Sequence, residues 1–363
     1  MGIEWPSHGG QPAMVKKQFH IHNNVIDFSA NIHPFGPPNW MKQVLNDSYD
    51  RMSHYPDPSY PDATNALAKF CQVDKDEVLV TNGGAEAIFL TAKYFEGGNA
   101  LIIQPTFSEY ERACQHYHLD VQHVYLDKAD ALRLPLDEII DQLSWADVVY
   151  LCRPNNPTGT VVKETEIRLI LDAAKKTGTY LVVDEAFVDF LDEDEDCSDL
   201  VSVMQEYHQL ILLRSMTKMF AVPGLRVGYM LANKEIIKVA KQAQIPWSVN
   251  AIAGAIIPLM LEDQAFVAKS RRFFHAELIR LRERLEGMNY YMSPSSANFY
   301  LLRDNENPNA TSDLFEFLLH HGILARHTDN FKQLDGDYLR FAIRSESEND
   351  LLLDALSAWR RQR

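Results

Sequence analysis

Residues 180–187 read Tyr180-Leu181-Val182-Val183-Asp184-Glu185-Ala186-Phe187, a short apolar run that ends in two acids. The run predicts a β-strand that is apolar along its whole length, as in a parallel sheet covered on both faces. An aspartate at the end of such a strand is partly buried, so it needs a cationic partner or a capping role to remain charged. Ligands of parallel sheets gather at this end of the strands. Asp184 is therefore a candidate site residue, with a helix cap or a salt bridge as the alternative.

Similar apolar runs recur on both sides of this segment. They occupy residues 78–81, 100–103, 148–152, 210–213 and 228–231. Amphipathic stretches of helical length, such as residues 85–95 and 165–177, separate most of them. Alternating strands and helices predict an α/β fold in which helices cover a mostly parallel sheet.

The pattern changes after about residue 260. Residues 265–287 predict a long charged helix, because Phe274, Leu278 and Leu281 recur at helical spacing. Further strands and helices are expected at residues 298–302, 312–321, 323–326, 338–343 and 348–360. This order is typical of a smaller α+β domain.

The first 40 residues show little periodicity and carry three prolines, Pro34, Pro37 and Pro38. We expect them to form an arm laid over another part of the protein rather than a core element. The sequence therefore predicts three parts: an N-terminal arm at 1–40, a large domain at 41–260 and a small C-terminal domain at 261–363.

The composition indicates which class of partner the protein binds. The chain has 363 residues, with 35 Lys and Arg against 50 Asp and Glu, and a net charge of −15. This acidic excess would repel a phosphate backbone, so nucleic acid is disfavoured as a partner. No run approaches the roughly 18 apolar residues of a membrane helix, and the first residues lack the basic start of a signal peptide. We expect a cytoplasmic protein that binds a small molecule.

Metal binding is not expected. The four cysteines are far apart and form no C-x-x-C pair, so they are predicted to be reduced thiols: Cys71, Cys114, Cys152 and Cys197. His20 and His22 flank a single residue without an evident third ligand. The acidic run at residues 192–196 lacks the spaced glycine of a calcium loop and predicts a solvated turn.

Four polar segments each follow a predicted strand, so we expect them at one rim of the sheet. They are residues 82–86 (Asn-Gly-Gly-Ala-Glu), 154–159 (Pro-Asn-Asn-Pro-Thr-Gly), 184–187 (Asp-Glu-Ala-Phe) and 215–218 (Ser-Met-Thr-Lys). A glycine-rich turn that enters a helix presents free N–H groups to an anion. Lys218 lies in a polar turn, where it is either a nucleophilic amine shielded from solvent or an ordinary surface lysine.

Taken together and in this order, the segments resemble the fold-type I pyridoxal-phosphate enzymes of the aminotransferase class I/II family. Asp184 lies 28 residues after Asn156 and 34 before Lys218, and Arg226 follows eight residues beyond Lys218. The resemblance extends over nearly the whole chain. It implies a pyridoxal 5'-phosphate cofactor and a homodimer.

The resemblance also implies a role for each residue around the cofactor ring. Lys218 would bind the cofactor covalently and move protons at the substrate Cα, and Asp184 would pair with the ring nitrogen. Asn156 would donate to the ring oxygen, and Phe107 would stack on the ring face. Phe187 stands where related aminotransferases usually carry tyrosine, so one hydrogen bond worth roughly 1 kcal/mol is missing there. The alternative is that Phe187 merely packs.

The same resemblance implies how the cofactor phosphate is held. The residues assigned to it are Gly84, Ala85, Glu86, Ser215, Thr217 and Arg226. Tyr55, in the segment Tyr55-Pro56-Asp57, would reach the phosphate bound by the neighbouring subunit.

A narrower resemblance comes from His8-Gly9-Gly10, from residues 27–32 and from residues 246–251 (Pro-Trp-Ser-Val-Asn-Ala). These segments resemble the threonine-phosphate decarboxylases of cobalamin biosynthesis, which are close to the histidinol-phosphate aminotransferases. The resemblance implies a phosphorylated amino-acid substrate, O-phospho-L-threonine, and loss of CO₂. Whether phosphoserine is also used stays open.

The substrate-binding residues that this resemblance implies are His8, Asn31, Arg326 and Arg344. Arg344 would hold the substrate carboxylate, a task that suits a planar guanidinium. Arg326 would hold the substrate phosphate, with a surface arginine as the alternative, and His8 would close over the same group or serve only the arm. Two other functions stay open: an aminotransferase of the histidinol-phosphate type, and a non-catalytic sensor that binds the cofactor.

Overall fold

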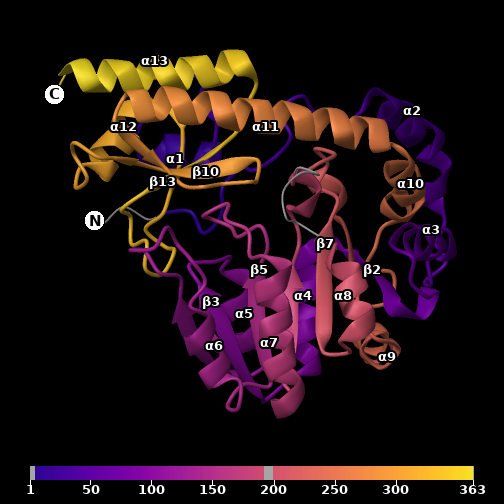
Figure 1. Cartoon of the computed structure of the whole chain (residues 1–363). Helices are drawn as coiled ribbons and strands as arrows, with labels where there is room; N and C mark the ends of the chain where they lie inside the picture. Colours follow the sequence, from indigo (N-terminus) through magenta and orange to yellow (C-terminus); the bar gives the residue numbers. More distant parts are fainter. Residues whose placement is uncertain (1–4, 192–198, 363) are drawn as a thin grey trace.

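The computed structural model describes residues 5–191 and 199–362, and its elements are arranged around one large sheet (Figure 1). Cys197 and the acidic run at 192–196 lie outside the described residues. Cys71, Cys114 and Cys152 are free thiols and are buried.

The large sheet has seven strands in the order β2-β8-β7-β6-β5-β3-β4. Their bounds are β2 (Val78–Asn82), β3 (Asn99–Gln104), β4 (Asp120–Tyr125), β5 (Val148–Cys152), β6 (Tyr180–Asp184), β7 (Leu210–Ser215) and β8 (Val227–Leu231). Within this sheet β8 runs antiparallel to both of its neighbours, and the other pairings are parallel. The predicted α/β fold with a mostly parallel sheet is confirmed.

Sequence reasoning missed the edge strand β4. Its residues Asp-Val-Gln-His-Val-Tyr alternate between exposed and more buried positions, whereas the prediction looked for runs that are apolar throughout. An edge strand needs burial on fewer sides, so its sequence is more polar.

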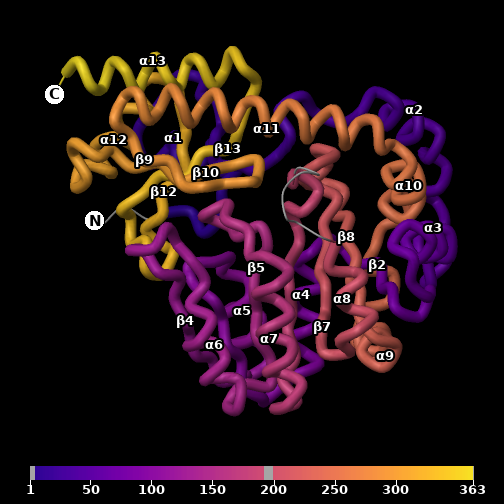
Figure 2. Tube along the Cα trace, viewed as in Figure 1, coloured from indigo at the N-terminus to yellow at the C-terminus, as the bar shows by residue number. Residues whose placement is uncertain are grey.

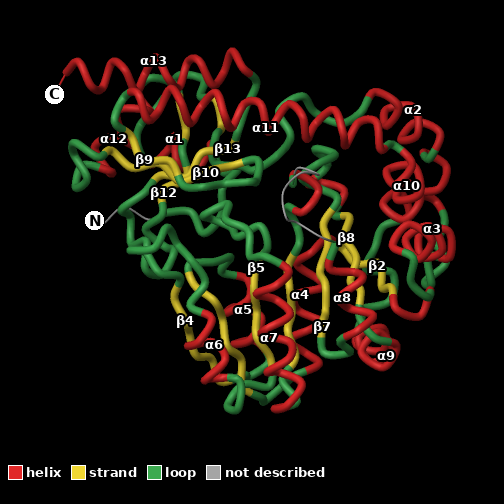
Figure 3. Tube along the Cα trace, viewed as in Figure 1, coloured by secondary structure: helices red, strands yellow, loops and turns green. Residues whose placement is uncertain are grey.

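Helices cover both faces of the sheet because side chains alternate along each strand. Val182 of β6 belongs to one buried layer together with residues of α4 (Gly83–Tyr94), α5 (Glu109–His116) and α9 (Lys234–Ala243). Its neighbours Leu181 and Val183 face the opposite layer, formed by α6 (Leu136–Gln142), α7 (Glu164–Thr177) and α8 (Leu200–Glu206). Figure 3 shows the strands between these two helical layers.

A smaller antiparallel sheet, in the order β12-β13-β10-β9, lies above the large one. The strands of this sheet are β9 (Tyr290–Met292), β10 (Phe299–Asp304), β12 (Arg326–His327) and β13 (Leu339–Ala342). The helices of this part of the chain are α11 (Gln264–Gly287), α12 (Thr311–His320) and α13 (Glu346–Gln362). Figure 2 follows the long α11 from α10 across the upper edge to this sheet. The helices and strands predicted after residue 260 are found, but strand β9 was not predicted, and the domain boundaries themselves stay a prediction.

The remaining elements flank these two sheets. They are α2 (Asn39–Asp47), α3 (Pro61–Cys71), α10 (Ala251–Glu262) and the short 3₁₀ turns at Tyr49–Ser53, Lys75–Glu77, Val188–Phe190 and Pro223–Leu225. No single helix in the described residues has the length and hydropathy to cross a membrane. The pair α10 and α11 meets those criteria only jointly, with a bend of 73°.

The N-terminal segment is more integrated than an arm. Beyond α1 (Pro12–Gln18), strand β1 (Ile26–Asp27) pairs in parallel with β11 (Ile323–Leu324). Phe28 is fully buried and packs against Phe341. The expectation of an arm without core residues is therefore wrong for this part, because a two-residue strand leaves no periodicity in the sequence.

Candidate active site

The predicted site residues meet in one cavity of about 390 Å³ between the carboxyl ends of the parallel strands and the smaller sheet. The predicted residues that line it are His8, Asn31, Gly84, Ala85, Phe107, Asn156, Asp184, Phe187, Ser215, Thr217, Lys218, Arg226 and Arg326. Parallel strands end at a common edge, and residues as far apart in the chain as His8 and Arg326 converge beside it.

Asp184 and Lys218 are the two titratable groups at the centre of the cavity. The Asp184 carboxylate accepts hydrogen bonds from the Tyr110 hydroxyl at 2.7 Å and from the Ala186 N–H at 3.0 Å. Burial raises the pKa of Asp184 to about 6, despite these donors. Burial, together with the charges of Arg340 and Arg226, lowers the pKa of Lys218 to about 8. Lys218 is therefore a shielded amine rather than a solvated surface lysine.

An anion-binding cup lies at the start of α4. Asn82 precedes the helix without a side-chain cap, so the N–H groups of the first turn remain available. Gly83 has a φ of +73°, and a Cβ there would lie 2.5 Å from the Arg226 Nη2. Only glycine allows Arg226 to approach this turn so closely.

Two hydroxyl groups face the same cup, and Glu86, predicted to contribute its backbone there, keeps its side chain outside it. The Ser215 and Thr217 hydroxyls lie 2.9 Å apart at the end of β7. The Glu86 side chain accepts hydrogen bonds from the Asn82 N–H and from Gln244, outside the cavity. Only the backbone of Glu86 is therefore available to an anion.

Arg340, and not Arg344, lines the cavity. The Arg340 guanidinium donates to the Asn156 Oδ1 and, at 2.7 Å, to the Ser29 carbonyl. Arg344 instead donates to Glu348 at 3.1 Å, at the start of α13. Strand β13 ends at Ala342, so the chain has turned towards α13 before it reaches Arg344. The prediction for Arg344 is corrected to Arg340.

Arg326 is the second buried arginine of the cavity. It donates to the His327 and Ser7 carbonyls and to the Asn330 side chain, all of them uncharged acceptors. Burial lowers the pKa of Arg326 to about 10 and that of Arg340 to about 9. Within residues 5–191 and 199–362, neither guanidinium forms an ion pair with a carboxylate. Each has lost water without gaining an anion, which favours an anionic ligand.

The segment from Trp5 to Gly10 closes one side of the cavity. The Trp5 ring stacks on His327 with the ring centroids 3.9 Å apart. His8 lines the cavity, and its Nε2 hydrogen-bonds the Glu109 carboxylate at 2.9 Å. This hydrogen-bond partner of His8 was not predicted.

The remaining predicted residues differ in their surroundings. The Asn31 side-chain oxygen is buried and has no hydrogen-bond partner among the residues that the structure describes. Phe187 lines the cavity and packs edge-on against Phe299, with the ring centroids 4.8 Å apart. Tyr55 lies outside this cavity and is 83% exposed.

Arg340 and Tyr110 are among the cavity residues that sequence reasoning missed. Tyr110 follows Phe107 by three residues at the start of α5, so helical spacing was the signal for it. Arg340 and Arg344 lie in one short segment of the sequence, and the choice between them depended on where strand β13 ends.

The cavity fits pyridoxal phosphate. The N-terminal cup of α4 with Arg226 suits its phosphate, Asp184 suits its ring nitrogen, and the shielded amine of Lys218 suits its aldehyde. The fold and these residues define a pyridoxal-phosphate enzyme of fold type I. Residues 23–356 match the family model "Aminotransferase class I and II", and the chain belongs to that family. Its members depend on pyridoxal phosphate.

The chain is similar to both decarboxylases and aminotransferases. Threonine-phosphate decarboxylase of Salmonella typhimurium is 35% identical over 338 residues, which cover 92% of this chain and 91% of the relative. The solved histidinol-phosphate aminotransferase of Clostridium acetobutylicum is 30% identical, with a TM-score of 0.86 over 93% of this chain and 99% of that one. The enzyme of that name from Sinorhizobium meliloti, solved with pyridoxal-5'-phosphate, shares the fold at 19% identity, with a TM-score of 0.86 over 95% and 93% of the two chains.

Proposed function

We propose that this protein removes CO₂ from O-phospho-L-threonine and forms (R)-1-amino-2-propanol O-2-phosphate, the linker used in cobalamin biosynthesis. The single observation that carries the proposal is the pair Arg326 and Arg340. Both are buried in the cavity, and neither has a carboxylate partner among the described residues. Arg226, at the helix cup, would serve the cofactor phosphate, so two cations remain for a substrate with two anions. Phosphothreonine has a carboxylate and a phosphate.

The residues around the ring would have these roles. Lys218 binds the cofactor covalently and moves a proton at the substrate Cα. Asp184 holds the ring nitrogen, and Asn156 donates to the ring oxygen. The bound cofactor supplies an electron-accepting ring, which weakens the Cα bond held perpendicular to it. Phe107 packs on the ring face.

The outcome of the reaction would then depend on where the two substrate anions are held. Arg326, with His8 beside it, fixes the phosphate, and Arg340 contacts the carboxylate. Holding both ends sets the rotation about Cα, and such positioning can contribute several kcal/mol to the choice of bond. Holding the carboxylate so that its bond to Cα is the one weakened would lead to CO₂ release. Asn31, with its unpartnered oxygen, would complete the substrate contacts.

The alternative is an aminotransferase acting on histidinol phosphate, which the relatives of that class favour. Histidinol phosphate has a phosphate but no carboxylate, so it would leave one of the two buried arginines without an anion. The amino-acceptor of such an enzyme would have to occupy that arginine in the other half of the reaction.

Product analysis tests the proposal. The holoenzyme is incubated with phosphothreonine in one reaction, and with histidinol phosphate and 2-oxoglutarate in another. Stoichiometric CO₂ and the phosphorylated amino alcohol are expected in the first. If phosphothreonine instead gives pyridoxamine phosphate and a phosphorylated keto acid without CO₂, the protein is an aminotransferase. A static spectral change without turnover would indicate a cofactor-binding sensor.

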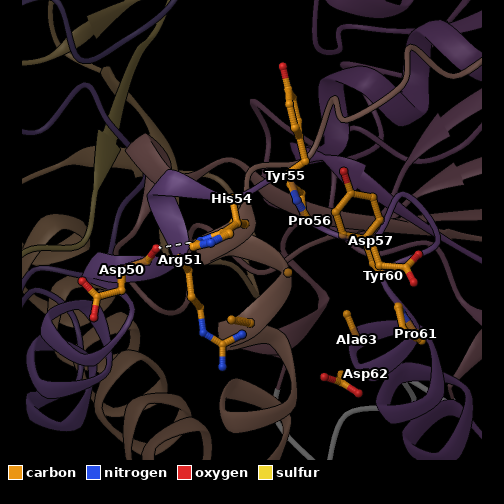
Figure 4. Close-up of a pocket in the computed structure, with 13 residues that line it drawn as sticks. Asp50, Arg51, His54, Tyr55, Pro56, Asp57, Tyr60, Pro61, Asp62 and Ala63 are labelled. Atoms are coloured by element: carbon orange, nitrogen blue, oxygen red, sulfur yellow. Dashed lines mark hydrogen bonds between the residues drawn. The ribbon is translucent and has the colours of Figure 1, made fainter.

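We further propose a homodimer in which Tyr55 reaches the partner's cofactor phosphate. Tyr55 borders a surface cavity of about 410 Å³, and Figure 4 shows its ring extended away from the other labelled side chains. The Trp247 indole lies beside it and donates to the Pro56 carbonyl at 3.1 Å. Exposed apolar side chains, Tyr49, Met52 and Ile245 among them, are typical of a surface that another chain covers.

A further inference from the structure

Tyr110 lies against the carboxylate that would face the cofactor ring nitrogen. It is the second residue of α5, its side chain is fully buried, and its hydroxyl is 2.7 Å from the Asp184 Oδ2. No role in the site was assigned to it above. The contact joins a helix on one face of the sheet to the end of strand β6.

The hydroxyl of Tyr110 must be the donor in this contact. An ionised carboxylate only accepts hydrogen bonds. Burial, and next the charge of Asp184, raise the pKa of Tyr110 well above its usual range, so the hydroxyl keeps its proton at any working pH. The other oxygen of Asp184 accepts from the Ala186 N–H. Each carboxylate oxygen therefore has one protein donor and a free lone pair.

We propose that Tyr110 is a positioning residue that aims the Asp184 carboxylate at the cofactor ring nitrogen and keeps it ionised. This role is independent of the substrate, so it holds for a decarboxylase and for an aminotransferase. The ring of Tyr110 is itself held in place. It stacks on Tyr150 at 5.7 Å and 17°, and it meets Phe107 edge-on at 5.9 Å.

The charged and titratable groups around Asp184 come from each neighbouring element. Cys152 of β5 pairs with it in register, and burial raises the pKa of this thiol, so it is uncharged. Glu185, the next residue of β6, is paired with Arg153 and Arg214 and faces them. Lys218 follows β7 and lowers the pKa of Asp184, as Tyr110 and the Ala186 N–H do. Among the groups that oppose the effect of burial on the pKa of Asp184, Tyr110 contributes most.

Loss of the Tyr110 hydroxyl would change the proton balance of cofactor binding. With one donor fewer, the Asp184 carboxyl is protonated over a wider range of pH. Asp184 and the ring nitrogen share one proton in the complex. When the Asp184 carboxyl and the pyridine nitrogen are both protonated before binding, one of the two protons must be released as the ring binds. Low pH opposes this release. The loss of affinity should be larger in acid than in base.

The test compares Tyr110→Phe with Tyr150→Phe. Tyr150 is equally buried, and its hydroxyl lies 3.2 Å from the Thr91 hydroxyl rather than near Asp184. The dissociation constant of pyridoxal phosphate is measured on each apoprotein at pH 6.5 and 8.5. We expect Tyr110→Phe to weaken binding by about tenfold at pH 6.5 and by clearly less at pH 8.5. Tyr150→Phe should follow the wild type at both values.

A double-mutant cycle separates this role from a merely structural one. If Tyr110 acts through Asp184, then Tyr110→Phe has little further effect on cofactor affinity in the Asp184→Asn background. Additive effects, or a loss that is the same at both pH values, would overturn the proposal. Where Tyr110→Phe folds poorly, the phenolic proton is followed by NMR in the wild type. A slowly exchanging signal that is lost in Asp184→Ala, which removes the acceptor, is expected, and a signal unchanged by that substitution would overturn the proposal.

Discussion

Arg340 donates a hydrogen bond to the side-chain oxygen of Asn156, so a residue of β13 in the small sheet holds the loop that follows β5. This contact orients the amide, because its oxygen is occupied and its Nδ2 group has no acceptor among residues 5–191 and 199–362. The amide can then donate to the oxygen of the cofactor ring. The same arginine would contact the substrate carboxylate. One side chain would therefore both bind the substrate and orient the amide that donates to the cofactor oxygen.

The first prediction compares the two arginines of the β13 region. Arg340→Ala should raise the KM for phosphothreonine by roughly tenfold or more, because it removes a hydrogen-bonded charge partner of the carboxylate. Arg344→Ala is the matched control, since Arg344 is paired with Glu348 away from the cavity. Steady-state kinetics of both variants decide the point. A larger effect of Arg344→Ala would restore the original assignment.

Arg326→Ala should raise the KM for phosphothreonine by a similar factor and change cofactor affinity little, because Arg226 and the α4 cup hold the cofactor phosphate. A loosely held phosphate should also allow some conversion of the cofactor to its amine form. Absorbance spectra recorded during turnover would detect that product. Equal losses of substrate and cofactor affinity would contradict the assignment of Arg326 to the substrate.

Lys218→Ala should abolish turnover and the visible absorbance of the bound cofactor, because no other lysine of the described residues lines the cavity. Circular dichroism serves to confirm that the fold is kept. Visible absorbance that persists without added amine would rule out this lysine as the attachment point.

The pH dependence of cofactor attachment follows from the same lysine. Its pKa is lowered to about 8 by burial, and only the neutral amine is a nucleophile. The neutral fraction grows as the pH rises towards the pKa and saturates above it. Reconstitution of the apoprotein should therefore accelerate from pH 6.5 to about 8 and change little beyond pH 9. A rate still rising tenfold per pH unit at pH 9 would mean that the amine is not shielded.

Tyr55→Phe should weaken cofactor retention, by about 1.5–3 kcal/mol if the lost hydrogen bond has a charged acceptor. Dialysis of the holoenzyme measures the retention, and sedimentation at assay concentration measures the oligomeric state. Trp247→Phe, beside Tyr55, keeps an aromatic ring and should have a smaller effect. A fully active monomer would contradict the proposed contribution of Tyr55.

The fold class and part of the candidate site could be predicted from local sequence. Runs such as residues 148–152 and 180–184 are apolar throughout, and a strand of this kind is stable only when both faces of its sheet are covered, so the α/β class was readable. Asp184 and Lys218 were readable for a related reason. A polar residue that directly follows a buried strand lies at the edge where parallel sheets bind their ligands.

The tertiary structure decided what depends on distant contacts. Arg340 and Arg344 have the same chemistry in one short segment, and only the turn into α13 places one in the cavity and the other beside Glu348. Tyr110 gains its contact with Asp184 from the packing of α5 against the sheet. Phe28 joins the core through pairing of β1 with β11, nearly 300 residues away. Local sequence patterns predict which positions are buried and which type of element they form. The partner of a side chain depends instead on how separate elements pack.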